Sequence, residues 1–247
     1  MRIALDQRSE VGTRAGRILL AERTLELLGL VDQNPSDEDD RLVRVLDLSA
    51  YDVLVTDAED PSDVLAAAAE AGIPAVTWVD RPAAGVQAAV DAAVLVGANL
   101  GSAIAPSLAA HEAAGAGEGS PIDIVWTEPG RPLRRGHPSR FPDPVGPLWA
   151  AERARSGVVR RFAAPTQGEW AGAVVHVAAT EHPRERIVAV ADHAAHLEAL
   201  ALAAGALVAV DPAFEELRGV ITVDDVAETF LDVVLGLGLE VAEWRSD

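Results

Sequence analysis

The chain has 247 residues, 49% of them hydrophobic, which is enough to bury a core in one large domain or two small ones. It has a formal net charge of -19 and no cysteine, which excludes disulfides and thiolate metal sites and makes nucleic acids and anionic membranes poor partners. All 20 basic side chains are arginine, so Schiff-base chemistry and a lysine acid are excluded as well.

The hydropathy pattern contains no targeting or membrane segment. The N-terminus turns polar after one short apolar run, which does not fit a signal peptide. No stretch reaches the roughly 18–20 uninterrupted apolar residues of a membrane span. We therefore expect a cytoplasmic protein.

Strands alternate with helices over the first half of the chain. Hydrophobic periodicity predicts helices at residues 11–24, 61–72 and 102–114, the first of them capped by Ser9 and the second ended by Gly72. The predicted strands are residues 2–5, 28–31, 52–56, 73–79 and 92–96. This alternation predicts a Rossmann-like parallel sheet.

The pattern changes after the glycine-rich segment AAGAGEGSP, which predicts a first domain at residues 1–117 and a second at 118–247. Strands are predicted at residues 122–127, 158–163, 171–179 and 186–190. The last three have no helices between them, which indicates a mixed α+β sheet domain in an overall α/β fold. A long helix, HAAHLEALALAAGALVAV, is expected to lie across this sheet, followed by an amphipathic helix and a short final strand.

The long helix is apolar on most faces, more than one sheet needs to cover. We therefore expect part of it to meet a second subunit. Its histidines, three residues apart, could share a face, but no second compact pair of ligands supports a metal site, and none is predicted.

The most unusual segment is EPGRPLRRGHPSRFPDPVGPLW, which concentrates basic residues in an acidic chain. Its arginines could clamp the carboxylates or phosphates of a small anionic metabolite. Alternatively they pair with the surplus acids of the protein or across a subunit interface. His137 is the candidate general acid if catalysis exists. The candidate substrate-binding residues are Arg131, Arg134, Arg135 and Arg140.

The order of these elements resembles the dihydrodipicolinate reductase-like group of Rossmann-fold NAD(P)-dependent oxidoreductases. Three stretches carry the likeness: VLVTDAEDPSDVLAAAAEAGIPAVTWV, VLVGANLGSAIAPSLAAHE and RERIVAVADHAAHLEALALAAGALVA. In that group a dinucleotide domain precedes an open mixed sheet that carries substrate contacts and the oligomer interface. The resemblance implies NAD or NADP as cofactor and an assembly such as a homodimer or homotetramer.

The resemblance also implies a glycine-rich turn after the first strand, where the sequence has ALDQRSEVGTRAG. Only Gly12 stands in a glycine position, because Asp6 and Ser9 occupy the other two. Asp6 would repel a pyrophosphate at the helix N-terminus, and Arg8 or Arg14 could partly offset that repulsion.

Other candidate cofactor-binding residues follow the predicted strands. Asp32, about 20 residues after Gly12, would bind a ribose hydroxyl or is an ordinary loop acid. Thr56 and Asp57 end a central strand, where open α/β sheets bind ligands, although Asp57 could instead cap the next helix. Asn99 offers an amide to a ligand, and Ser102 either caps a helix that attracts anions or has a purely structural role.

Two functions follow from these observations. The first is hydride transfer between NAD(P) and a small carboxylate substrate. The second is a catalytically inactive relative that binds an acidic metabolite or acts as a dimeric interaction module. The altered glycine turn, and the lack of a counterpart to the family's paired-histidine and lysine stretch, favour the second. The turn at Asn99 and the arginine-rich segment favour the first.

Overall fold

The computed structural model describes residues 1–35, 39–80, 92–114, 120–128, 139–140, 159–165, 169–178, 185–214 and 216–245. The chain divides into two compact units. Unit 1 comprises Met1–Asn99 and Glu198–Asp225, and unit 2 comprises Leu100–Leu197 and Val226–Asp247. The domain boundary predicted between residues 117 and 118 lies outside the described residues.

Unit 1 contains a seven-stranded sheet with strand order β12-β6-β5-β4-β1-β2-β3, in which every neighbouring pair is parallel. Apolar runs such as VLVT in β4 and AVLV in β6 are buried throughout, as expected of strands covered on both faces. The strands are β1 (Arg2–Asp6), β2 (Leu27–Leu30), β3 (Leu42–Arg44), β4 (Val53–Thr56), β5 (Ala75–Thr77), β6 (Ala93–Val96) and β12 (Gly219–Thr222).

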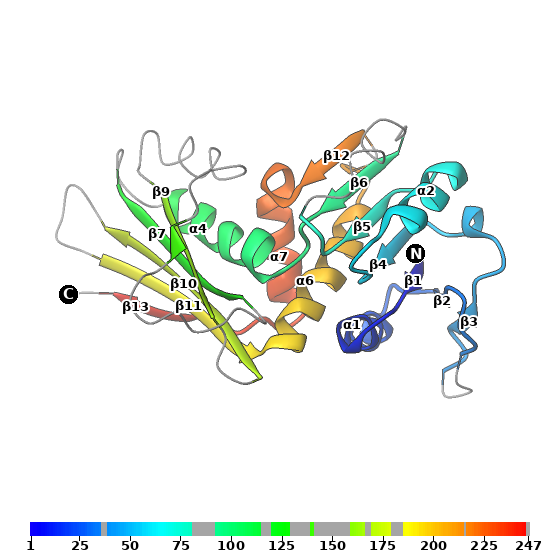
Figure 1. Cartoon of the computed structure of the whole chain (residues 1–247), viewed down its shortest axis with the longest axis horizontal. Coiled ribbons are helices and arrows are strands. Elements are labelled where there is room, and N and C mark those ends of the chain that lie inside the picture. The colour runs from blue at the N-terminus through cyan, green and yellow to red at the C-terminus, as the bar shows by residue number, and fades with distance from the viewer. Residues whose placement is uncertain are drawn as a thin grey trace. The chain divides into compact units, whose positions relative to one another are not determined.

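Helices α1 and α2 each follow a strand of unit 1 in the chain, whereas α6 follows a strand of unit 2 (Figure 1). Ser9 caps α1 as expected, because its Oγ accepts a hydrogen bond from the Val11 amide. Gly72 ends α2 in the left-handed conformation, with φ of 71°. The helical segments are α1 (Glu10–Ala21), η1 (Leu48–Ala50), α2 (Ser62–Ala71) and the part of α6 (Ala194–Ala209) from Glu198 onward; η3 (Val223–Val226) follows β12.

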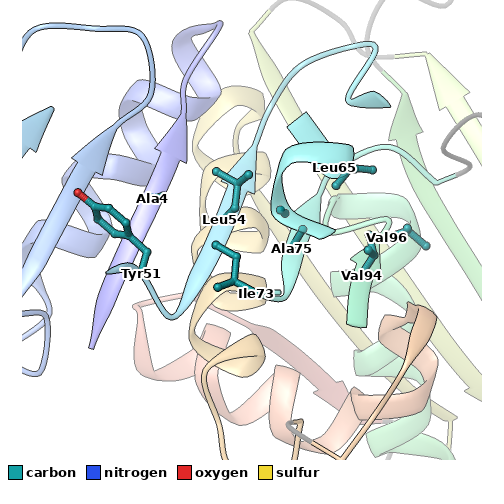
Figure 2. Close-up of a cluster of buried hydrophobic side chains, with 9 residues drawn as sticks. Ala4, Tyr51, Leu54, Leu65, Ile73, Ala75, Val94 and Val96 are labelled. Atoms are coloured by element: carbon teal, nitrogen blue, oxygen red, sulfur yellow. The ribbon is translucent and has the colours of Figure 1, made fainter. Parts of the chain in front are cut away.

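A buried cluster joins α2 to the central strands of this sheet (Figure 2). Leu65 of α2 is fully buried, and Tyr51, just before β4, is only 6% exposed. The cluster consists of Ala4, Tyr51, Leu54, Leu65, Ala68, Ile73, Ala75, Val94 and Val96. Side chains of four neighbouring strands and one helix therefore share one apolar core.

Unit 2 contains a six-stranded sheet with strand order β13-β11-β10-β7-β9-β8. The β7–β9 pair is parallel and the other pairs are antiparallel, so the expected mixed sheet is confirmed. Helix α4 packs on β7 and β10. The elements are η2 (Leu100–Ile104), α4 (Ala105–Ala114), β7 (Ile122–Glu128), β8 (Ser139–Arg140), β9 (Val159–Pro165), β10 (Trp170–Ala178), β11 (Glu185–His193), α7 (Ala227–Gly236) and β13 (Ala242–Arg245).

Helix α6 corrects one expectation, because most of it belongs to unit 1 instead of lying across the second sheet. A Cβ placed at Gly205 would lie 2.9 Å from Val76 Cγ1 and 3.4 Å from Leu95 Cδ2, so the helix packs closely on β5 and β6. Residues 197–206 are all buried within the chain. The apolar surface of this segment is therefore covered by its own chain and does not require a second subunit.

Two strands of the first sheet were not predicted. β3 and β12 form its two edges, and they have only three and four residues. Segments that short show no clear period, and β12 reaches the sheet from a distant part of the sequence. Among the helices of the described ranges, none has the length and hydropathy that a membrane crossing requires.

Gly29 of β2 provides a test of the packing in unit 1. A Cβ at this position would lie 2.5 Å from Tyr51 Cζ and would also collide with Oη, and the ring is buried. Gly29→Ala should therefore lower the free energy of unfolding by about 1–3 kcal/mol, measured by chemical denaturation.

The matched control is Gly236→Ala in α7, where a Cβ would meet nothing within 4 Å. Because alanine is the better helix former, this variant should be as stable as the natural chain or more stable. Equal unfolding curves for Gly29→Ala and the natural chain would contradict the contact between Tyr51 and β2.

Candidate functional site

The turn between β1 and α1 binds a carboxylate that comes from the chain itself. Asp57 follows β4 and is 2% exposed. Its Oδ1 accepts a hydrogen bond from the Arg8 amide at 2.6 Å. Its Oδ2 accepts three more, from the Ser9 amide at 2.9 Å, the Ser9 hydroxyl at 2.6 Å and the Gly12 amide at 2.8 Å. The carboxylate thus satisfies amides at the helix N-terminus, where the helix dipole favours negative charge.

Gly12 leaves the space that the Asp57 carboxylate needs for this contact. A Cβ on Gly12 would lie 2.7 Å from Asp57 Oδ2, 2.8 Å from Cγ and 2.9 Å from Oδ1. Any side chain here would collide with the bound carboxylate. The glycine that the resemblance assigned to a pyrophosphate therefore makes room for Asp57 in this chain.

A second buried carboxylate lies at the end of β1. Asp6 is fully buried; its Oδ2 accepts a hydrogen bond from Thr56 Oγ1 at 2.8 Å, and its Oδ1 forms an ion pair with Arg8 Nη2 at 2.6 Å. Thr56 Oγ1 also accepts a hydrogen bond from the Ala58 amide. Arg8, which could have offset a phosphate, is thus paired with Asp6. Arg14 pairs with Glu10 on the exposed side of α1.

The loops after β5 and β6 are joined by the side chain of Asn99. Its Nδ2 donates to the Trp78 carbonyl at 2.8 Å and to Asp80 Oδ1 at 2.9 Å. The indole Nε1 of Trp78 donates in turn to the carbonyl of Ala58 after β4. Asn99 therefore lies at the carboxyl edge of the sheet, as predicted, and it braces neighbouring loops there.

Gln7 and Gln33 join the turn after β1 to the turn after β2. Gln7 Nε2 donates to Gln33 Oε1 at 2.8 Å, and Gln33 Nε2 donates to the Gln7 carbonyl at 2.7 Å. Asp32 lies in the second of these turns with φ of 54°, a left-handed conformation. Asp32 thus lies in the turn after β2, next to Gln33, and its contact with a ribose hydroxyl stays a prediction.

The remaining predicted site residues are less informative. Ser102 is the third residue of η2, inside this π-helical segment of unit 2. Of the arginine-rich segment, only Ser139 and Arg140 are described, and they form β8. The candidate residues outside the description are Arg131, Arg134, Arg135 and His137.

A cavity of about 750 Å³ lies at the opposite edge of the first sheet. Its lining includes residues that precede four of the parallel strands: Met1, Asp52, Pro74 and Arg218. In a parallel sheet these positions are the amino ends of the strands. Open α/β sheets usually bind ligands beyond the carboxyl ends, so the cavity does not coincide with the expected cofactor position.

Within the described ranges, one face of the sheet of unit 2 carries exposed and half-buried side chains, and we call it the open face. On β10 the even-numbered residues from Trp170 to His176 are exposed or half-buried, whereas Ala171, Ala173, Val175 and Val177 are buried. Strand register places residues of β11 and β13 on the same face. The open face consists of Trp170, Gly172, Val174 and His176 of β10, Ile187, Ala189, Ala191 and His193 of β11, and Ala242 and Trp244 of β13.

The open face is apolar and exposes large side chains. Trp170 is 64% exposed, Trp244 56% and Val174 41%. His176 lies near Asp123 and His193 near Glu169, at 3.8 Å and 3.3 Å. These residues were not predicted as a site. The sequence signal was in WAGAVVHVA, where both sides of a single strand carry apolar residues.

No protein-family model matches the chain, and no curated protein matches its sequence. Solved structures do match it. The dipicolinate-bound dihydrodipicolinate reductase from Paenisporosarcina sp. TG-14 is 11% identical, with a TM-score of 0.52 over 92% of this chain and 99% of that chain. The DAP dehydrogenase of C. glutamicum, in complex with DAP, is 15% identical, with a TM-score of 0.57 over 94% and 95%. An engineered D-amino acid dehydrogenase bound to NADP+ gives the same identity, coverage and TM-score.

At these identities the likeness establishes the fold and nothing finer. The parallel sheet followed by a mixed sheet agrees with it, and the resemblance expected from the sequence is confirmed at that level. The chain therefore has the two-part α/β fold of the dihydrodipicolinate reductase-like NAD(P) oxidoreductases.

Proposed function

We propose that this chain is a non-redox protein with the dehydrogenase fold, which works as a self-associating interaction module. The observation that carries the proposal is the Asp57 carboxylate at the N-terminus of α1. In dinucleotide-binding folds this helix terminus receives the pyrophosphate. Here a carboxylate already accepts the amides of Arg8, Ser9 and Gly12.

The charges in the turn also oppose a dinucleotide. Asp6 and Asp57 are both buried, and Arg8 is the cation that pairs with Asp6. A pyrophosphate would therefore meet two carboxylates and one guanidinium that is already paired. Repulsion of this kind is strong where water is excluded. The residues present do not fit an NAD(P) pyrophosphate, and we derive no hydride-transfer step for this chain.

Other contacts at the carboxyl edge support the same proposal. Asn99 and Trp78 use their side-chain donors on neighbouring loops, and Gln7 and Gln33 bond to each other. A ligand would have to replace these hydrogen bonds instead of satisfying free groups, which lowers the net gain from binding. The competing function, hydride transfer between NAD(P) and a small carboxylate, requires Asp57 to leave the turn.

The open face supplies the positive part of the proposal. It places indoles at two ends, Trp170 and Trp244, with glycine and alanine residues between them. A second copy could seat its indoles over these small residues, as the self-complementary interface of a symmetric dimer requires. Two carboxylates, Asp123 and Glu169, lie beside the histidines His176 and His193 of this face. The small anionic metabolite expected at the arginine-rich segment stays a prediction, because most of that segment is outside the described residues.

Cofactor binding can be tested by thermal denaturation with NAD, NADP, NADH and NADPH at millimolar concentration. A ligand at about a hundred times its Kd adds about 2.7 kcal/mol of stability. For a chain of this size that would raise Tm by about 5–10 °C. We expect a change below about 1 °C with each of the four. A clear rise with any of them would contradict the non-redox proposal.

Self-association can be tested by light scattering coupled to size-exclusion chromatography. Burying a large apolar side chain contributes about 1.5–3 kcal/mol, so each tryptophan should change the dimer Kd by about tenfold or more. We expect the natural chain to have the mass of a dimer or tetramer at micromolar concentration. The variant with both Trp170→Glu and Trp244→Glu should be a monomer with an unchanged circular dichroism spectrum.

The control for self-association is Leu46→Glu, which changes a 91% exposed apolar residue of unit 1. It should keep the mass of the natural chain. A monomeric natural chain, or a double variant that retains its full mass, would refute the interface.

A further inference from the structure

We infer that the N-terminus of α1 is still able to bind a phosphate group and that the Asp57 carboxylate occupies this site. Asp57 is thus an internal ligand, and its contact with the turn is autoinhibitory. The inference rests on the proposed function, because it explains why the natural chain should not bind a dinucleotide. It goes further in naming one side chain as the obstacle and a phosphate or pyrophosphate group as the ligand that it excludes.

The donors that hold Asp57 converge on one anionic group from the residues around the start of α1. Three of them converge on a single oxygen, Oδ2, and a fourth on Oδ1. They are the backbone amides of Arg8, Ser9 and Gly12 with the hydroxyl of Ser9, all from the residues that open a helix of 12 residues. Such convergent amides at a helix start bind phosphate oxygens in general. The carboxylate that reaches them is separated from Gly12 by 45 residues of chain.

The N-terminus of α1 is capped without the help of Asp57. Ser9 Oγ accepts the hydrogen bond of the Val11 amide, which is the ordinary N-cap of α1. Thr13 Oγ1 and the Thr13 amide both donate to the Ser9 carbonyl. Removing the Asp57 carboxylate would therefore leave the cap of α1 in place. The donors of Arg8, Ser9 and Gly12 that now converge on Asp57 would lose their acceptor.

The charge balance of the turn changes with that one side chain. The turn holds the carboxylates of Asp6 and Asp57 against the single guanidinium of Arg8, so its formal charge is negative. Without Asp57 the Asp6–Arg8 pair is neutral, and the helix N-terminus is the dominant electrostatic feature of the turn. Gly12 already provides the space, since its missing Cβ is what admits an anion this close to the helix.

The test compares Asp57→Ala with the natural chain and with Asp60→Ala. Asp60 is the matched control, an exposed carboxylate of the same loop that accepts hydrogen bonds from the Ser62 amide and hydroxyl. These two bonds hold the pKa of Asp60 below its usual value, and Asp60→Ala removes one carboxyl group just as Asp57→Ala does. The probe is inorganic pyrophosphate, with sodium chloride at equal ionic strength as the salt control.

We expect Asp57→Ala to have a lower Tm than the natural chain and to regain part of the difference when pyrophosphate is added. Titration calorimetry should give it an affinity for pyrophosphate at least about tenfold higher than that of the natural chain. The natural chain and Asp60→Ala should show no change beyond that in sodium chloride. A folded Asp57→Ala variant that binds pyrophosphate no better than the natural chain would overturn the inference.

If Asp57→Ala does not fold in chloride, Asp57→Ser and refolding of Asp57→Ala in pyrophosphate replace it. The inference expects pyrophosphate binding by a folded Asp57→Ser variant, or folding of Asp57→Ala that depends on pyrophosphate. Failure of both contradicts it. A rise in Tm of the natural chain with NAD(P) would instead refute the proposed function, so the two failures are distinguishable.

Gly12 gives an independent readout of the same contact. Gly12→Ala places a Cβ against the Asp57 carboxylate and should lower Tm in the natural chain. In the Asp57→Ala background the same substitution should cost much less, because the group it collides with is gone. Additive effects of the two substitutions would show that the two residues do not act together.

Discussion

The hydrogen bonds from the β1–α1 turn to Asp57 determine how the N-terminus of α1 is satisfied in unit 1. A helix N-terminus presents amides that need acceptors, and burial makes an unsatisfied amide costly. Many proteins with parallel α/β sheets meet this need with a bound phosphate. In this chain the residue after β4 supplies the acceptor, so the terminus is satisfied without a ligand.

Several neighbouring residues follow from this constraint. A buried anion against the first turn of α1 leaves no room for a side chain at position 12, which accounts for Gly12. A second acid, Asp6, is accommodated nearby because Arg8 and Thr56 pair with it. Burial of one carboxylate without such partners would cost several kcal/mol. The residues that differ from a glycine-rich turn therefore depend on one another. Gly12 makes room for Asp57, and Arg8 and Thr56 pair with the buried carboxylate of Asp6.

The sequence predicted the central strands well and the site only in part. Runs such as VLVT and AVLV are almost entirely apolar, so β4 and β6 were identified from them, with Thr56 at the end of β4 and with Asp57 and Asn99 in the turns that follow the two strands. Their partners could not be predicted, because the contact of Asp57 with Gly12 spans 45 residues and depends on strand order. The sequence analysis expected Arg8 or Arg14 to pair with a phosphate beside Asp6, whereas in the structure Arg8 pairs with Asp6 itself.

The errors at the sheet edges and in α6 have a common cause. Hydrophobic periodicity indicates how much apolar surface a segment has, but it does not show which part of the protein covers that surface. Helix α6 is apolar on most faces, which indicated a partner subunit, yet residues 197–206 are buried in their own chain. β10 shows the reverse case, since its pattern resembled an ordinary strand although Trp170 and Val174 are exposed.

The two units therefore differ in what each can gain from a partner. At the carboxyl edge of unit 1 the side-chain donors described above already have acceptors within the chain, so a polar ligand there would exchange hydrogen bonds with little net gain. The open face of unit 2 exposes indole and valine surface to water, and every part of it that a partner covers is a gain in free energy. Exposed apolar surface that a partner could bury thus lies on the open face of unit 2, whereas the Asp57 carboxylate at the β1–α1 turn stabilises unit 1 from within.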